Sequence, residues 1–163
     1  MLVFGNQDTH NGFVSPDHSP QRLSVEPGSP YRILLVDDDP ATRILLTRIL
    51  RQPDYLFTEA DDGIQALDLL EKSCFDLIIT DLRMPNLDGI AFAVRARVRW
   101  PHIPIVLMSG YFSEAAWKLV SEVFGGFIQK PINREILMRI IQPLLVKSTT
   151  KSHGPINSIP KPQ

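Results

Sequence analysis

The sequence alternates short apolar runs, rich in β-forming residues, with longer segments whose apolar residues recur at helical spacing. Strands are expected at Arg32–Val36, Tyr55–Glu59, Asp76–Thr80, Ile103–Met108 and Gly126–Gln129. Helices are expected at about 40–51, from 61–63 onward, from the 84–89 loop to about Trp100, at Ser113–Phe124 and after Asn133. Five strand–helix units in this order predict an α/β fold, with a parallel sheet covered by helices on both faces.

Polar, proline-rich stretches flank this pattern. Half of the 14 prolines lie in residues 1–30 and 148–163, which show no sustained periodicity. Such segments bury too little apolar surface to fold, so we expect two disordered tails around one globular domain at 31–147. Pro143 lies within the last predicted helix and is expected to kink or shorten it.

Composition and charge exclude several classes of protein. A net charge of −1 gives no global attraction to nucleic acid or to an anionic membrane. The chain has no 18-residue apolar run and no secretory signal at its start. A single cysteine, Cys74, fits a reducing compartment. We therefore expect a cytoplasmic protein with neither nucleic-acid nor membrane partners. A nucleotide-triphosphate switch is disfavoured because no G-x-x-x-x-G-K-[ST] motif exists.

Chemically competent side chains follow four of the five predicted strands. They are Asp37-Asp38, Asp81, Ser109 and Lys130. Because the carboxyl ends of parallel strands meet at one edge of the sheet, these side chains are expected to converge there. Asp39 is expected to cap the first helix instead, and the second strand, which ends at Glu59-Ala60, contributes nothing obvious.

This set of residue types suits phosphoryl chemistry. Asp37, Asp38 and Asp81 would repel one another in a shared cleft, and a hard divalent cation such as Mg²⁺ would relieve that repulsion. Carboxylates can form aspartyl phosphates, which makes Asp81 the candidate nucleophile. Lys130 and Ser109 could then contact the phosphoryl oxygens with a positive charge and a hydroxyl.

Four segments, in this order, resemble the response-regulator receiver domains of two-component systems. They read ILLVDDDP (33–40), DLIITDLRMPNLDG (76–89), PIVLMSG (104–110) and FIQKP (127–131). The resemblance covers the whole predicted globular part. It implies a flavodoxin-like (βα)5 fold, a doubly wound sheet with strand order 2-1-3-4-5.

The resemblance also implies the metal ligands and the phosphoacceptor. Asp37 and Asp38 match the acidic pair that holds Mg²⁺, directly or through water. Asp81 matches the phosphoacceptor and also contributes to the metal site. Arg83 stands where the family supplies a further metal ligand through its backbone carbonyl.

The remaining matches concern the phosphoryl oxygens and the conformational switch. Lys130 matches the family's active-site lysine, and Pro131 the proline that commonly follows it with a cis peptide bond. Ser109 matches the switch hydroxyl, and Phe127 the aromatic side chain whose rotamer is expected to follow it.

The implied function is that of a single-domain response regulator. A histidine kinase or a histidine phosphotransfer protein would supply the phosphoryl group in a Mg²⁺-dependent phosphorelay. The chain would catalyse its own phosphorylation and slow dephosphorylation, but would not be an enzyme acting on other substrates. With no helix-turn-helix in the sequence, output through protein contacts of the fourth helix, fifth strand and fifth helix is expected.

Two other functions stay open. A haloacid-dehalogenase-like phosphatase also uses an aspartate nucleophile with Ser/Thr and Lys, but it needs a second aspartate two residues later, where this chain has Arg83. A receiver that acts as a phosphorylation-independent adaptor is the non-enzymatic alternative. Arg83 and Tyr111 flank the expected site, and we hypothesise that they tune the lifetime of the phosphoryl group by restricting water.

Overall fold

One five-stranded parallel sheet forms the centre of the molecule. The computed structural model describes residues 28–111 and 124–150, with side chains as far as 147. The strands are β1 (Tyr31–Val36), β2 (Tyr55–Ala60), β3 (Leu77–Asp81), β4 (Ile105–Ser109) and β5 (Gly126–Gln129). Their order is β2-β1-β3-β4-β5, and every neighbouring pair is parallel. The predicted fold class and strand order are confirmed.

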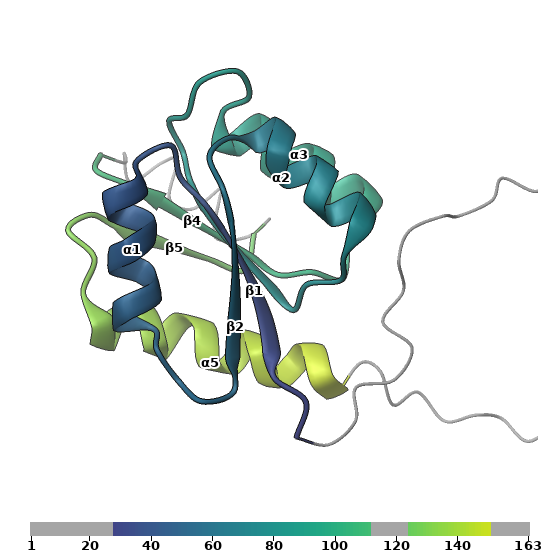
Figure 1. The fold of residues 1–163 in the computed structure, drawn as a ribbon, viewed down its shortest axis with the longest axis vertical. Coiled ribbons are helices and arrows are strands. Elements are labelled where there is room, and N and C mark those ends of the chain that lie inside the picture. The colour runs from purple at the N-terminus through teal and green to yellow at the C-terminus, as the bar shows by residue number, and fades with distance from the viewer. Residues whose placement is uncertain (1–27, 112–123, 151–163) are drawn as a thin grey trace, which may run out of the picture.

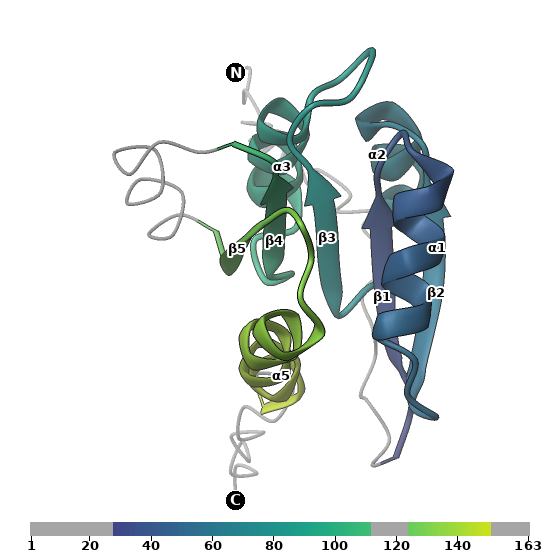
Figure 2. The ribbon, with the colours of Figure 1, turned by 90° about the vertical axis from the view of Figure 1, so that its left-hand side faces the viewer.

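Helices cover both faces of this sheet. They are α1 (Pro40–Ile49), α2 (Gly63–Lys72), α3 (Gly89–Arg99) and α5 (Arg134–Thr150). Figures 1 and 2 show α1 and α5 on one face and α2 and α3, side by side, on the other. Right-handed crossovers between parallel strands produce this doubly wound arrangement.

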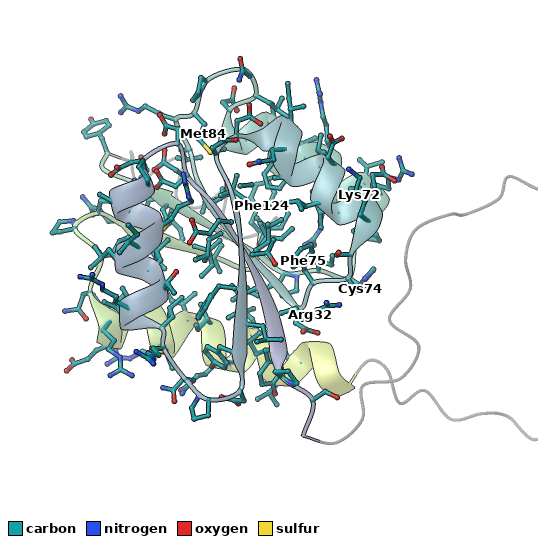
Figure 3. All side chains as sticks on the ribbon, in the orientation of Figure 1. Arg32, Lys72, Cys74, Phe75, Met84 and Phe124 are labelled. Carbon is teal, nitrogen blue, oxygen red and sulfur yellow. The ribbon has the colours of Figure 1, made fainter. Side chains whose placement is uncertain are left out.

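Alternating residues of the strands supply two separate cores. Leu34 of β1 points to the α2–α3 side, where Phe92 of α3 packs against it in one buried cluster. Ile33, one position earlier, belongs to the opposite cluster together with Leu46 of α1 and Leu137 of α5. Figure 3 shows Phe75 and Phe124 beneath the α2–α3 layer. Burial on both faces explains why the central strands read as continuous apolar runs.

Side-chain caps begin the helices that follow the strands. Asp39 accepts a hydrogen bond from the backbone nitrogen of Ala41, and Asp62 and Asp88 cap α2 and α3 in the same manner. Asn133 accepts from the first turn of α5. These caps fix where each loop ends. The expected role of Asp39 as a cap is confirmed.

Some predicted boundaries were wrong. α5 continues through Pro143 to Thr150, so the expectation that Pro143 could shorten this helix is wrong. Pro143 is exposed and so is Arg139, four residues earlier, so water can satisfy the carbonyl that the proline leaves unpaired. β4 begins at Ile105, two residues later than predicted, and includes Ser109.

The predicted helix at Ser113–Phe124 lies outside the described residues, apart from Phe124 itself. The two predicted tails also lie outside them, apart from 28–30 and 148–150. None of the helices in the described part of the chain is long and apolar enough to cross a bilayer.

Candidate functional site

Three of the side chains predicted to converge, those of Asp37, Asp81 and Lys130, meet at one edge of the sheet. The strands in Figure 2 all point towards that edge. Asp37 follows β1, Asp81 ends β3, and Lys130 follows β5. The Lys130 Nζ atom lies 2.6 Å from Asp81 Oδ1 and 3.1 Å from Asp37 Oδ2. A single ammonium group therefore bridges two carboxylates that come from different strands.

Both carboxylates are held in fixed orientations. Asp37 is 1% exposed and Asp81 is 6% exposed. The second oxygen of each accepts a hydrogen bond from the backbone nitrogen two residues later, Asp39 to Asp37 at 2.9 Å and Arg83 to Asp81 at 2.7 Å. Each carboxylate thus has one oxygen bound to the backbone and the other bound to Lys130. Side chains held at both oxygens are pre-organised for chemistry.

Burial and charge oppose each other in this cluster. Burial raises the pKa of Asp37, although the Asp39 amide and Lys130 both favour its charged form. Burial also acts to lower the pKa of Lys130, but its hydrogen bonds to Asp81 and Asp37 outweigh burial and raise it. The lysine is therefore a permanent cation at neutral pH, while the charge on Asp37 is costly. A further cation would relieve that cost.

Ser109 ends β4, and Phe127 lies within the neighbouring strand β5. The Ser109 hydroxyl donates to the carbonyl of Tyr111 at 2.8 Å and accepts from the Tyr111 nitrogen at 3.2 Å. Phe127 is 7% exposed and packs in the core on the α2–α3 side. The Lys130–Pro131 peptide bond is cis, as the resemblance implied. The serine hydroxyl therefore bonds to its own loop in this conformation.

The β3–α3 loop is held by one bond to the start of α2 and one bond within the loop itself. The Asn86 amide, on a residue with φ of 62°, donates to Asp62 Oδ2 at 2.7 Å. At the other end of the loop, the Gly89 nitrogen donates to the carbonyl of Leu82. A Cβ atom on Gly89 would come within 1.9 Å of the carbonyl oxygen of Asp81. Only glycine fits this close approach.

An open groove of about 950 Å³ adjoins the acidic cluster. Asp38, Arg83, Ser109 and Tyr111 line it, and Met84, labelled in Figure 3, lines it as well. Asp38 and Tyr111 are exposed, and Tyr111 is 74% exposed. The groove leaves room for a phosphoryl donor to approach this edge of the sheet.

The oxygen donors fit a hard divalent cation. Among the described residues, no three His, Cys, Asp or Glu side chains form a ready-made metal cluster. Mg²⁺ does not need one, because it usually binds one or two carboxylates and keeps several waters. The buried carboxylates of Asp37 and Asp81, with exposed Asp38 nearby, provide such a set.

The prediction missed one pair of residues next to the site. Arg43 of α1 donates to the carbonyl oxygen of Asp37 and pairs with Glu59 near the end of β2. The expectation that the end of the second strand contributes nothing obvious is therefore corrected, because Glu59 holds Arg43 beside the site. A signal did exist, because the implied strand order places β2 beside β1, so an acid near the end of β2 lies close to the start of α1.

Fold and site together define a doubly wound α/β protein with a lysine-bridged pair of aspartates at the carboxyl edge of its sheet. A family model for the response regulator receiver domain matches residues 33–142. The chain therefore belongs to the receiver-domain family of two-component signalling, whose members accept a phosphoryl group on an aspartate.

The relatives and solved structures agree with this assignment. The response regulator protein FleR of Pseudomonas aeruginosa is 31% identical over 111 residues, which are 68% of this chain and 24% of FleR. The chain spans between 24% and 55% of the length of its first curated relatives.

Two similar solved structures contain magnesium. The response regulator TrrA of Thermotoga maritima, in complex with Mg²⁺–BeF, is 31% identical, with a TM-score of 0.63 over 70% of this chain and 98% of TrrA. The receiver domain of sensor histidine kinase PA1611 of P. aeruginosa, with magnesium coordinated in its active-site cleft, is 28% identical. Its TM-score is 0.64 over 72% of this chain and 99% of that domain.

Proposed function

We propose that the chain is a response regulator that accepts a phosphoryl group on Asp81. One observation carries the proposal: the Asp81 carboxylate ends β3 with one oxygen on the Arg83 amide and the other on Lys130. The carboxylate oxygen would attack phosphorus, and the bond from phosphorus to the donor's histidine nitrogen would break. The Lys130 ammonium group, which now contacts the Asp81 carboxylate, would then bind the negatively charged phosphoryl oxygens.

Magnesium is part of this proposal. Asp37, Asp38 and Asp81 would hold it, with the backbone carbonyl of Arg83 as a further ligand. When bound, Mg²⁺ neutralises charge on the transferring group and aligns it for in-line attack. Bound magnesium in the PA1611 receiver domain and the TrrA complex supports the same ligand type here.

We further propose a histidine kinase or a histidine phosphotransfer protein as the donor. Ser109 would turn from Tyr111 towards the phosphoryl group, and the side chain of Phe127 would follow. β5 and α5, together with residues 113–124, would carry the change to a protein target. Because the Ser109 hydroxyl bonds only to backbone atoms of Tyr111, beyond the end of β4, its reorientation would break no bond between strands.

Mg²⁺-dependent labelling by acetyl phosphate tests the acceptor. Intact-mass measurement should show the gain of one phosphoryl group on the wild type and none on Asp81→Asn. Asp68→Asn, a change of an exposed aspartate on α2, is the matched control and should label as the wild type does. No labelling of the wild type would favour a phosphorylation-independent adaptor, and rapid turnover of many phosphomonoesters would favour a phosphatase.

A pull-down identifies the partners. Wild type treated with acetyl phosphate and untreated Asp81→Asn should retain different proteins if output depends on phosphorylation. Identical sets of partners would argue for the adaptor.

A further inference from the structure

Arg43 joins three elements beside the acidic cluster. Its Nη1 atom donates to the carbonyl oxygen of Asp37 at 2.5 Å. Its Nε atom lies 2.9 Å from Glu59 Oε2, so the guanidinium connects α1 and β2 to the loop after β1. The Arg43 side chain is only 16% exposed, whereas Glu59 is 44% exposed. A rigid guanidinium with two bound partners is well suited to hold a backbone carbonyl in place.

The carbonyl that Arg43 holds belongs to the peptide between Asp37 and Asp38. Asp38 is exposed, and its carboxylate makes no hydrogen bond to any described residue. The direction of that carboxylate therefore depends on how its backbone is held. Three bonds hold the adjacent residue: Asp37 N to the Ala60 carbonyl, Asp39 N to Asp37 Oδ1, and the bond from Arg43.

Of these three bonds, only the one from Arg43 fixes the orientation of the Asp37–Asp38 peptide plane through its oxygen. Loss of this bond would let the plane rotate and take the Asp38 carboxylate with it.

Charge explains why Arg43 is paired with Glu59. An unpaired guanidinium beside the carboxylates would repel a divalent cation and could itself bind Asp37 or Asp38. Glu59 neutralises the guanidinium and holds its Nε edge, so that the other edge faces the carbonyl and not the carboxylates. Glu59 itself is held by β2, in register with Leu35 of β1.

We propose that Arg43 and Glu59 are positioning residues that set the affinity of the site for a divalent cation, although neither touches it. The inference rests on the proposed function, since it assumes that Asp37 and Asp38 bind Mg²⁺. It extends the site to a pair of residues that orient the ligand-bearing peptide. Outer residues that orient metal ligands commonly change metal affinity when they are altered.

Calorimetric titration with Mg²⁺ tests the proposal on the unphosphorylated full chain. Arg43→Gln should weaken Mg²⁺ binding by about tenfold, the lower end of the usual effect of removing such a partner. Glu59→Gln should weaken it less, because the hydrogen bond to Arg43 can persist without the charge. The double variant should be no weaker than Arg43→Gln, since the two residues act as one unit.

Two further variants separate positioning from loss of folding. Arg48→Gln removes an exposed arginine from the last turn of the same helix and should leave the dissociation constant unchanged. Arg43→Lys should recover part of the affinity, because an ammonium can still donate to the carbonyl. Thermal unfolding of each variant checks that the fold is retained.

The outcomes are distinguishable. Equal Mg²⁺ affinity in the wild type and in folded Arg43→Gln would overturn the positioning role and leave the phosphoacceptor proposal standing. A wild type that binds no Mg²⁺ would overturn both. Additive losses in the double variant would overturn the claim that Arg43 and Glu59 act together.

Discussion

Lys130 should stabilise the folded protein mainly by neutralising the two carboxylates it touches, so Lys130→Met should destabilise the fold. At an effective dielectric constant near 20, unit charges at 2.6 and 3.1 Å attract by roughly 5–6 kcal/mol each, before the cost of removing the ions from water. Breaking a buried ion pair costs about 3–5 kcal/mol overall. The Lys130 side chain is 30% exposed, so water partly screens its attraction to the carboxylates. We therefore expect Lys130→Met to lower the free energy of unfolding by about 2–4 kcal/mol.

The loss should depend on pH. Removing Lys130 removes two of the influences that lower the pKa of Asp37, so burial would raise that pKa further above its ordinary value of 3.8. A carboxyl group with a raised folded pKa favours folding below its unfolded pKa, and this contribution is lost as pH rises towards its folded pKa. The destabilisation of Lys130→Met should therefore be small near pH 4 and grow towards pH 7.

Urea unfolding at several pH values, in EDTA and in Mg²⁺, measures this effect. Because a bound cation replaces the lost charge, Lys130→Met should bind Mg²⁺ more tightly than the wild type, so the stability difference should narrow as Mg²⁺ is added. A site at 100 times its dissociation constant gains about 2.7 kcal/mol. Lys72→Met is the control, on an exposed lysine at the end of α2, away from the site (Figure 3). A loss that is equal at pH 4 and pH 7, or insensitive to Mg²⁺, would refute the electrostatic reasoning.

Two other changes test the surroundings of Asp81. Gly89→Ala would place a Cβ atom 1.9 Å from the Asp81 carbonyl oxygen, so we expect a loss of at least about 2 kcal/mol in urea unfolding and weaker labelling by acetyl phosphate. Unchanged stability would mean that the loop yields freely. Arg83→Ala and Tyr111→Ala should each shorten the lifetime of the phosphoryl group, because both side chains are exposed on the groove where water would approach. Timed loss of the label measures this, and unchanged rates would contradict the hypothesis that they restrict water.

Much of the fold could be predicted from the sequence because local patterns and long-range packing agree. The buried strands appear as apolar runs, and the aspartates and the asparagine after them are the caps that begin the helices. Convergence of Asp37, Asp81 and Lys130 followed from one geometric rule about parallel strands.

The errors have physical causes that local patterns do not contain. Whether Pro143 ends a helix depends on whether its missing hydrogen bond faces water, which only the packed structure settles. The bond from Arg43 to Glu59 joins side chains 16 positions apart, and its geometry depends on how α1 packs beside β2. The sequence likewise does not predict that Lys130 bridges two carboxylates. Its residue types indicate contacts of the aspartates with a metal and of the lysine with a phosphoryl group, and not contacts with one another.

The lysine bridge between Asp37 and Lys130 joins residues 93 positions apart in the chain. Contacts of such long range tend to form slowly in folding, because closing a long loop costs entropy before the contact can stabilise the chain. During synthesis, Asp37 and Asp81 are added to the chain before Lys130. A nascent chain that lacks β5 would thus carry the Asp37 and Asp81 carboxylates without the ammonium group that bridges them. The cluster of Asp37, Asp81 and Lys130 would therefore be complete only once β5 and the residue after it have been made.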